Sequence, residues 1–163
     1  MSDPLRERLR ALGLHALAEQ LDDVVPSATK KRWSATQLLE HVATLKERER
    51  ARRSLERRTA RSKLGRLEAM ADFDWDWPTH ITADAVHAAL DLDFMKNGRN
   101  VVLVGAQGLG KTMIAKNIVH NAGLAGHSAH FITAPDLLLD LAGQESARAL
   151  DRRMKHYARF ALL

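Results

Sequence analysis

The sequence contains no cysteine, and aromatic residues make up only 5% of its 163 positions. The lack of cysteine excludes disulfides, a thiolate nucleophile, and zinc or iron–sulfur sites with cysteine ligands. No apolar run approaches the roughly 18 residues that a membrane-spanning helix needs. The polar, charged start over residues 1–10 is unlike a secretory signal peptide. The sequence therefore predicts a cytoplasmic protein without a membrane segment.

Positive charge is concentrated in one part of the chain. Residues 30–66 contain 13 basic and 4 acidic side chains, a local charge of +9, whereas residues 73–163 contain nine of each sign. A dense cationic block indicates an anionic partner, with nucleic acid ahead of acidic lipid. The alternative is a solvated helix whose Glu and Arg side chains pair with one another.

The first third of the sequence predicts two helices. Asp3-Pro4 is a helix start signal, and leucines recur at nearly helical spacing until Val25-Pro26-Ser27, where we expect this helix to end. Ser34 and Gln37 form a capping box that starts a second helix, predicted to run to about Arg66. After Leu45 this second helix is polar nearly all round, so it must be exposed or bound to a charged partner.

Aromatic and acidic residues alternate over residues 70–82, ahead of a helix that Thr82 is expected to cap and Gly98 to end. We interpret the alternating segment as an ordered linker whose aromatic side chains anchor it to the next domain, rather than as a ligand-contacting segment. The predicted organisation is a basic helical domain over residues 1–68, a linker over 69–82 and a nucleotide-binding domain over 83–163.

From residue 100 onward, short apolar segments alternate with helical patterns. Strands are predicted over residues 101–104, 128–132 and 160–163, and helices over 113–122, 135–141 and 145–158. This order predicts an α/β domain with a parallel sheet and right-handed crossovers.

Residues 105–112 read Gly-Ala-Gln-Gly-Leu-Gly-Lys-Thr and match the phosphate-loop motif G-x-x-x-x-G-K-[ST] in full. The glycines let backbone N–H groups approach phosphate oxygens, Lys111 is placed to reach the β- and γ-phosphates, and the Thr112 hydroxyl is placed to ligate Mg²⁺. The spacing does not fit a dinucleotide-binding fingerprint. The motif predicts a site for ATP and Mg²⁺ formed by Gly105, Ala106, Gln107, Gly108, Leu109, Gly110, Lys111, Thr112 and Met113.

Taken together, these features resemble the IstB-like insertion-sequence helper ATPases, which are AAA+ relatives of the DnaC-type helicase loaders. The resemblance extends along the whole chain. It is carried by residues 9–21, 38–58, 67–75, 100–112, 130–134 and 150–163. It implies a P-loop domain of AAA+ type with an incomplete parallel sheet, because the family's Walker B Asp-Glu pair is expected just after Phe160–Leu163. The chain thus resembles the front two-thirds of such a protein.

The resemblance also implies a function, which is ATP-dependent assistance of DNA transposition through binding to DNA and to a transposase. The candidate DNA-binding residues are Arg50, Arg52, Arg53, Arg57, Arg58 and Arg61. Without a Walker B carboxylate no catalytic residue is assigned, and we expect nucleotide binding with negligible hydrolysis and a tendency to self-associate. The alternatives are a helicase loader in DNA replication, a P-loop small-molecule kinase, and a non-functional truncated fragment.

Overall fold

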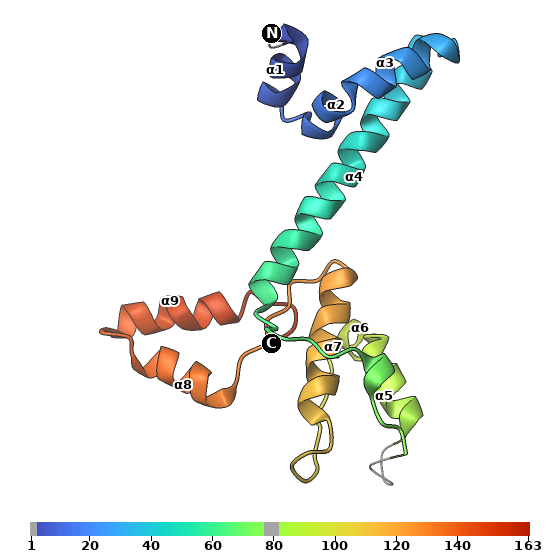
Figure 1. The fold of residues 1–163 in the computed structure, drawn as a ribbon. Coiled ribbons are helices and arrows are strands. Elements are labelled where there is room, and N and C mark those ends of the chain that lie inside the picture. Colours follow the sequence, from blue (N-terminus) through green and yellow to red (C-terminus); the bar gives the residue numbers. More distant parts are fainter. Residues whose placement is uncertain (1–2, 77–81) are drawn as a thin grey trace. The chain divides into compact units, whose positions relative to one another are not determined.

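The computed structural model describes residues 3–76 and 82–163, and the chain divides into two compact units, Met1–Ser54 and Leu55–Leu163. Figure 1 shows the elements in chain order. They are α1 (Pro4–Ala11), α2 (His15–Glu19), α3 (Leu21–Lys30), α4 (Ala35–Ser62), the 3₁₀ turn η1 (Met70–Asp72), α5 (Ala83–Leu90), α6 (Asp93–Lys96), α7 (Lys111–Leu124), α8 (Ala134–Ala142) and α9 (Ala147–Tyr157). The helix α4 contributes residues to both units.

The first unit is built differently from the prediction, because its leading segment forms three helices instead of one. Asp3 caps α1 as predicted, its side chain accepting a hydrogen bond from the Leu5 amide at 3.0 Å. Gly13, with a φ of +75°, then turns the chain before α2. Pro26 lies inside α3 and does not end it. A buried cluster of Leu17, Val24 and Leu45, with Leu9, Leu14, Trp33 and Val42 packed around it, joins these helices to α4.

The capping box at the start of α4 is confirmed. The Ser34 amide donates to Gln37 Oε1 at 2.8 Å, and the Gln37 amide donates to Ser34 Oγ at 3.2 Å. The helix ends at Ser62, before the predicted Arg66, because Lys63 and Gly65 both adopt positive φ values. Although α4 is long, it is highly charged, and no helix of the described residues has the length and apolarity needed to cross a bilayer.

The core of the second unit surrounds α7. Ile114, Ile118 and Ala122 of α7 are buried against α5 and against side chains from the segment before it. The predicted single helix from Thr82 to Gly98 is wrong, since Leu92 with a φ of +65° separates α5 from α6. The Thr82 backbone precedes α5, but its side chain makes no capping hydrogen bond. Residues 77–81 of the predicted linker lie outside the described residues.

The helices α8 and α9 pack against each other, as Figure 1 shows. Thr133 caps α8 by accepting a hydrogen bond from the Asp136 amide at 3.3 Å, and Ser146 caps α9. Between the two helices, the Asp140 carboxylate accepts hydrogen bonds from Arg153 and from the Tyr157 hydroxyl.

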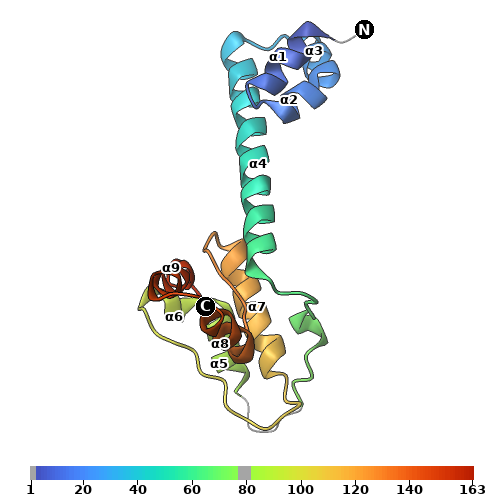
Figure 2. The same ribbon diagram turned by 90° about the vertical axis from the view of Figure 1, so that its left-hand side faces the viewer.

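The predicted α/β fold with a parallel sheet is wrong, because no strand forms in the described part of the chain. Residues 101–104, the expected first strand, have no backbone hydrogen-bond partner among the described residues, and Val102 and Val104 are 78% and 91% exposed. Figure 2 shows residues 99–110 as coil. Within the described residues, parallel pairing is limited to one isolated bridge between Ala129 and Leu162.

The reason for this difference lies in where the hydrogen bonds of residues 128–132 go. The Phe131 amide donates to the Ser62 carbonyl at 2.8 Å, and His130 Nδ1 lies 2.8 Å from the Arg61 carbonyl oxygen. The end of α4 therefore accepts a backbone hydrogen bond that a neighbouring strand could otherwise accept. A sheet needs consecutive pairing between strands, and a single bridge does not supply it.

Candidate functional site

The phosphate-loop motif forms an exposed turn that leads directly into α7. Gly108 and Gly110 have φ values of +84° and +75°, in the left-handed region that a residue with a Cβ adopts only at a cost. Gly110 is the residue immediately before α7, whose first helical residue is Lys111. Both glycines therefore have a conformational reason to be glycine, independent of any ligand.

Several backbone amides of this turn lack a backbone acceptor among the described residues. No backbone acceptor is found for the amides of residues 106–109 within the described chain. The first-turn amides of an α-helix also lack helical acceptors, and α7 has no acidic side chain in its first turn to compensate them. The N-terminus of α7 thus presents N–H groups and the positive end of the helix dipole, an arrangement that suits a phosphate group.

The side chains of Lys111 and Thr112 complete the turn. Lys111 Nζ donates to the Ala106 carbonyl at 2.5 Å, so the ammonium group is folded back over the loop. Thr112 is exposed, which leaves its hydroxyl accessible as an oxygen ligand. In the described residues no group of three or more His, Cys, Asp or Glu side chains could hold a metal ion by itself. A metal at this site would therefore need oxygen ligands from a bound molecule as well as from the protein.

A groove of about 570 Å³ lies beside the loop. Residues 107–113 form one side, and the other side comes from the segment before α5, namely Glu68, Asp72, Phe73 and Asp74. The volume falls within the range of small-molecule sites. The groove thus includes residues 107–113 of the predicted site but not Gly105 or Ala106, and it adds an acidic and aromatic wall. The motif did not predict this wall, although the alternation of acidic and aromatic residues over 70–76 was the signal for it.

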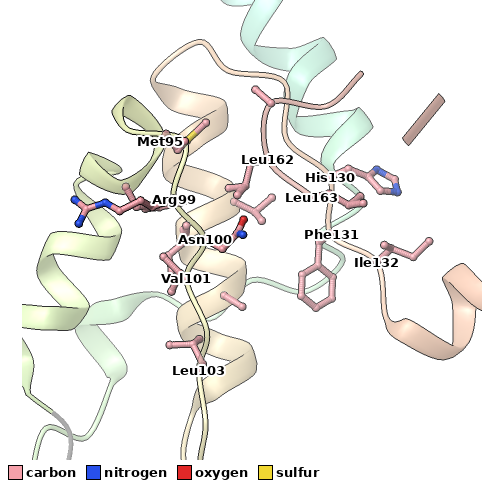
Figure 3. Close-up of a pocket in the computed structure, with 16 residues that line it drawn as sticks. Met95, Arg99, Asn100, Val101, Leu103, His130, Phe131, Ile132, Leu162 and Leu163 are labelled. Carbon is pink, nitrogen blue, oxygen red and sulfur yellow. The ribbon is translucent and has the colours of Figure 1, made fainter. Parts of the chain in front are cut away.

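A second cavity, of about 500 Å³, lies in the same unit and is shown in Figure 3. Its walls are mostly apolar and include Val101, Leu103, Phe131 and Leu162. In Figure 3 the Arg99 side chain points away from these residues. This cavity contains none of residues 105–113 and offers no ammonium group, so it is a poor site for a triphosphate.

The arginines predicted to bind DNA lie along α4, and they differ in what they contact. In the first unit, Arg53 Nη2 lies 2.7 Å from Glu49 Oε1, while Arg50 is exposed. Arg52 is also exposed and makes an intramolecular interaction. In the second unit, Arg58 Nε donates to the Gly123 carbonyl at 2.8 Å.

The remaining two candidates, Arg57 and Arg61, have exposed side chains in the second unit. They are four residues apart, so they lie on one face of the helix. The Arg61 backbone carbonyl lies 2.8 Å from His130 Nδ1 and accepts a hydrogen bond when that nitrogen is protonated.

Glu49 holds part of the positive charge of the first unit in place. Its side chain is only 3% exposed and lies 3.2 Å from Lys46 Nζ and 2.7 Å from Arg53. Burial alone would raise the pKa of this carboxyl, but the hydrogen bond from Lys46 and the charge of Arg53 outweigh burial and lower the pKa. Lys46 also donates to the Gly13 carbonyl, so this charge cluster joins α4 to the turn before α2.

Comparison with known proteins places the sequence among insertion-sequence proteins. It is 30% identical over 162 residues to an IS21-like protein of Bacteroides fragilis named for ATP binding, covering 98% of this chain and 80% of the relative. It is 30% identical to an insertion-sequence protein of Mycobacterium tuberculosis with a similar name, covering 96% of this chain and 63% of the relative. For the IS232 protein of Bacillus thuringiensis the identity is 26%, with 98% and 64% covered.

The chain therefore spans less than two thirds of the length of two of these three relatives. A family model described as IstB-like ATP binding protein matches residues 7–163, which is nearly the whole chain and includes the phosphate-loop motif. The chain belongs to the family of IstB-like ATP binding proteins.

Proposed function

We propose that this protein binds ATP as its magnesium complex, with residues 105–113 holding the phosphates. The single observation that supports this most strongly is the conformation of the loop. Gly108 and Gly110 take left-handed φ values just ahead of α7, beside amides for which the described part of the chain supplies no backbone acceptor. A peptide chain arranged in this way favours an anion at the helix N-terminus.

The side chains have separate roles in this proposal. Lys111 leaves the Ala106 carbonyl and turns its ammonium group to the β- and γ-phosphates. The Thr112 hydroxyl ligates Mg²⁺, and the ion supplies charge neutralisation between the phosphates. The carboxylates of Glu68, Asp72 and Asp74 on the opposite wall of the groove disfavour an uncomplexed triphosphate, and this favours the magnesium complex.

Replacing Lys111 by Ala tests the assignment. A hydrogen bond to a charged group is worth about 1.5–3 kcal/mol, so we expect Lys111→Ala to weaken Mg-ATP binding by at least about tenfold. Lys96→Ala is the matched control, because Lys96 is an exposed lysine of the same unit that pairs with Asp93 away from the groove. Titration calorimetry measures both. Equal affinity in the wild type and Lys111→Ala would refute the assignment.

We further propose that the arginine-rich segment over residues 46–66 binds duplex DNA without strong sequence preference. The segment combines a local charge of +9 over residues 30–66 with exposed guanidinium groups at Arg50, Arg57 and Arg61. Arg53 and Arg58 already contact protein groups, so they contribute less of the accessible charge than the sequence suggests. Phosphate groups would be the main contacts.

The salt dependence of binding distinguishes this proposal from a helix that is merely solvated. Each phosphate neutralised changes the slope of log K against log salt by about −0.9. Replacing Arg50, Arg57 and Arg61 by Gln should therefore make this slope shallower, by the amount that corresponds to two or three lost phosphate contacts. The affinity for a labelled duplex is measured by fluorescence anisotropy at several salt concentrations. The control variant carries Gln at Arg148, Arg152 and Arg159, which are exposed residues of the second unit. It removes the same amount of positive charge. Identical slopes for the two triple variants would contradict a role for α4.

These two activities fit one biological role. The relatives are named as insertion-sequence proteins that bind ATP, and we propose that this chain likewise serves DNA transposition. Its basic N-terminal part would contact DNA, its nucleotide-binding part would hold ATP, and a transposase would be the partner. Co-purification of the chain with the transposase of the same insertion sequence, dependent on Mg-ATP and DNA, tests the partner directly. If a replicative helicase is captured instead and the transposase is not, the role in transposition is wrong.

A further inference from the structure

The ring of Phe73 packs against the phosphate loop at Gly110. A Cβ added at Gly110 would lie 2.5 Å from Cε2 of Phe73 and 3.3 Å from its Cδ2. The first of these distances is well inside van der Waals contact. The Phe73 ring therefore lies directly against the Gly110 backbone, at the residue where the loop becomes helix α7.

Phe73 is itself held firmly. It is 8% exposed and belongs to the buried cluster that includes Ile114 of α7 and Val86 of α5. Its ring contacts Trp75 edge-on at a centroid distance of 4.8 Å, and Trp75 stacks on His87 of α5 at 5.0 Å. The ring at Gly110 is thus the inner end of an aromatic series that is fixed to two helices.

We propose that Phe73 is a positioning residue for the phosphate-binding loop. The inference rests on the proposed nucleotide binding by residues 105–113. Gly110 is the most conformationally permissive residue type and sits in a turn with few hydrogen bonds, so its backbone needs an external contact to stay in one conformation. The Phe73 ring supplies that contact. It fixes the peptide between Gly110 and Lys111, and with it the direction of the first free amides of α7.

The contact also explains why position 110 requires glycine twice over. A left-handed φ disfavours any Cβ, and the Phe73 ring occupies the space where the Cβ would lie. Gly108 has a similar φ, but nothing lies within 4 Å of its added Cβ. Gly108 and Gly110 therefore differ in kind, because of these two only Gly110 is contacted by a described side chain from a distant part of the sequence.

Positioning has a consequence that simple hydrophobic anchoring lacks. If the ring only anchors residues 70–76, its removal lowers stability and leaves nucleotide affinity intact in the folded protein. If the ring fixes the loop, its removal forces the nucleotide to order the loop on binding, and affinity falls. The two cases are separated by comparing Phe73→Ala with a variant that weakens the same cluster away from the loop.

The test measures Mg-ATP affinity by calorimetry for the wild type, Phe73→Ala and the matched control Val86→Ala, at a temperature where melting curves show all three folded. Val86 is 4% exposed in the same cluster and does not line the groove. We expect Phe73→Ala to lose roughly tenfold in affinity and Val86→Ala less than about threefold. Equal affinity of Phe73→Ala and wild type, or equal losses in both variants, overturns the inference.

A double variant adds a readout that a purely structural role would not move. Gly110→Ala places a methyl group in the ring's position, so the loop is displaced while Phe73 is present. We expect Phe73→Ala to cause little further loss of affinity in the Gly110→Ala background, because the contact is already lost there. Additive losses contradict the proposal.

If Phe73→Ala does not fold, Phe73→Leu replaces it in both comparisons, since it keeps apolar bulk but removes the flat ring. An affinity loss of at least threefold over Val86→Ala then supports the inference, and an unchanged affinity overturns it. Mg-ATP binding by the wild type distinguishes failure of the proposed function from failure of the proposed role of Phe73. If the wild type binds no Mg-ATP, the proposed function is wrong and this inference is wrong with it. If the wild type binds and the Phe73 variants bind equally well, only the inference is wrong.

Discussion

Asp140 shows how a single residue ties two helices together. Its carboxylate accepts hydrogen bonds from Arg153 and from the Tyr157 hydroxyl, which lies 2.7 Å away. The hydrogen bonds from Arg153 and Tyr157 lower the pKa of Asp140 below its ordinary value, while the hydrogen bond to Asp140 raises the pKa of Tyr157. The guanidinium of Arg153 also lies over the Tyr157 ring, 5.2 Å from its centroid. The sequence identified helices here but not this connection between them.

Asp140→Asn should make the pairing of α8 and α9 less dependent on pH. A carboxyl whose folded-state pKa is depressed contributes stability above its unfolded-state pKa, near 3.8, and loses it as the pH falls through the lower folded-state value. We therefore expect a lower melting temperature than wild type at pH 7, with the difference shrinking below about pH 4. Circular dichroism at both pH values measures this.

The control for this prediction is Asp151→Asn, since Asp151 of α9 pairs with Lys155 in an exposed position. Exposed pairs contribute little, so its melting temperature should stay near that of wild type at both pH values. A difference between Asp140→Asn and wild type that is the same at pH 7 and pH 3 would show that the charge of Asp140 is not responsible.

At the residue scale, the sequence predicted the loop but not its surroundings. The phosphate-loop motif is local, and its eight positions specify their own turn through the glycines and the helix that follows. Phe73 is 37 positions away from Gly110, and no spacing rule relates the two. The alternation of aromatic and acidic residues indicated that the segment docks somewhere, and the structure shows that it docks on the loop itself.

At the scale of elements, helix starts were predictable because caps are read from a few adjacent residues. Ser34 and Gln37 bond reciprocally, and Asp3 also acts as a cap. Interruptions were harder to foresee, since apolar periodicity continues across them. Leu92 takes a left-handed conformation although nothing in its residue type favours it. Pro26 ought to end a helix, yet α3 continues through it.

Ser34→Ala tests the cap of α4. The substitution removes the acceptor for the Gln37 amide and should lower the free energy of unfolding of the first unit by about 1 kcal/mol. Thr36→Ala is the control, because Thr36 is exposed within the first turn of α4 and alanine is the better helix former. Urea unfolding followed by circular dichroism compares the two. We expect Ser34→Ala to be clearly less stable than Thr36→Ala, and equal stability of the two variants would contradict a stabilising cap.

The predicted strands are absent from the described residues because strand formation depends on pairing partners, which residue patterns do not reveal. The apolar residues Val101, Val102 and Val104 have strand-forming side chains, but a strand also needs partners on its edges. The described residues supply none for this segment, and residues 128–132 bond to the end of α4 and to Leu162. Local preference is visible in the sequence, whereas the availability of a partner is a property of the whole fold.

At the scale of the whole molecule, the uneven distribution of charge along the chain agrees with the proposed separate sites for DNA and for nucleotide. Basic residues are concentrated in residues 30–66, and the phosphate loop follows in a region with equal numbers of acidic and basic residues. Membership of the IstB-like family covers both regions, since the match extends over residues 7–163.

The most direct test of the account is amide hydrogen exchange in the presence and absence of Mg-ATP. We predict that exchange slows in peptides covering residues 105–113, because the nucleotide's phosphates accept hydrogen bonds from these amides, and that Lys111→Ala reduces this protection at the same nucleotide concentration. The apolar cavity lined by Val101, Phe131 and Leu162 serves as the internal comparison, because it belongs to the same unit. Protection confined to that cavity, or binding without protection of residues 105–113, would contradict the claim that the phosphate loop holds the nucleotide.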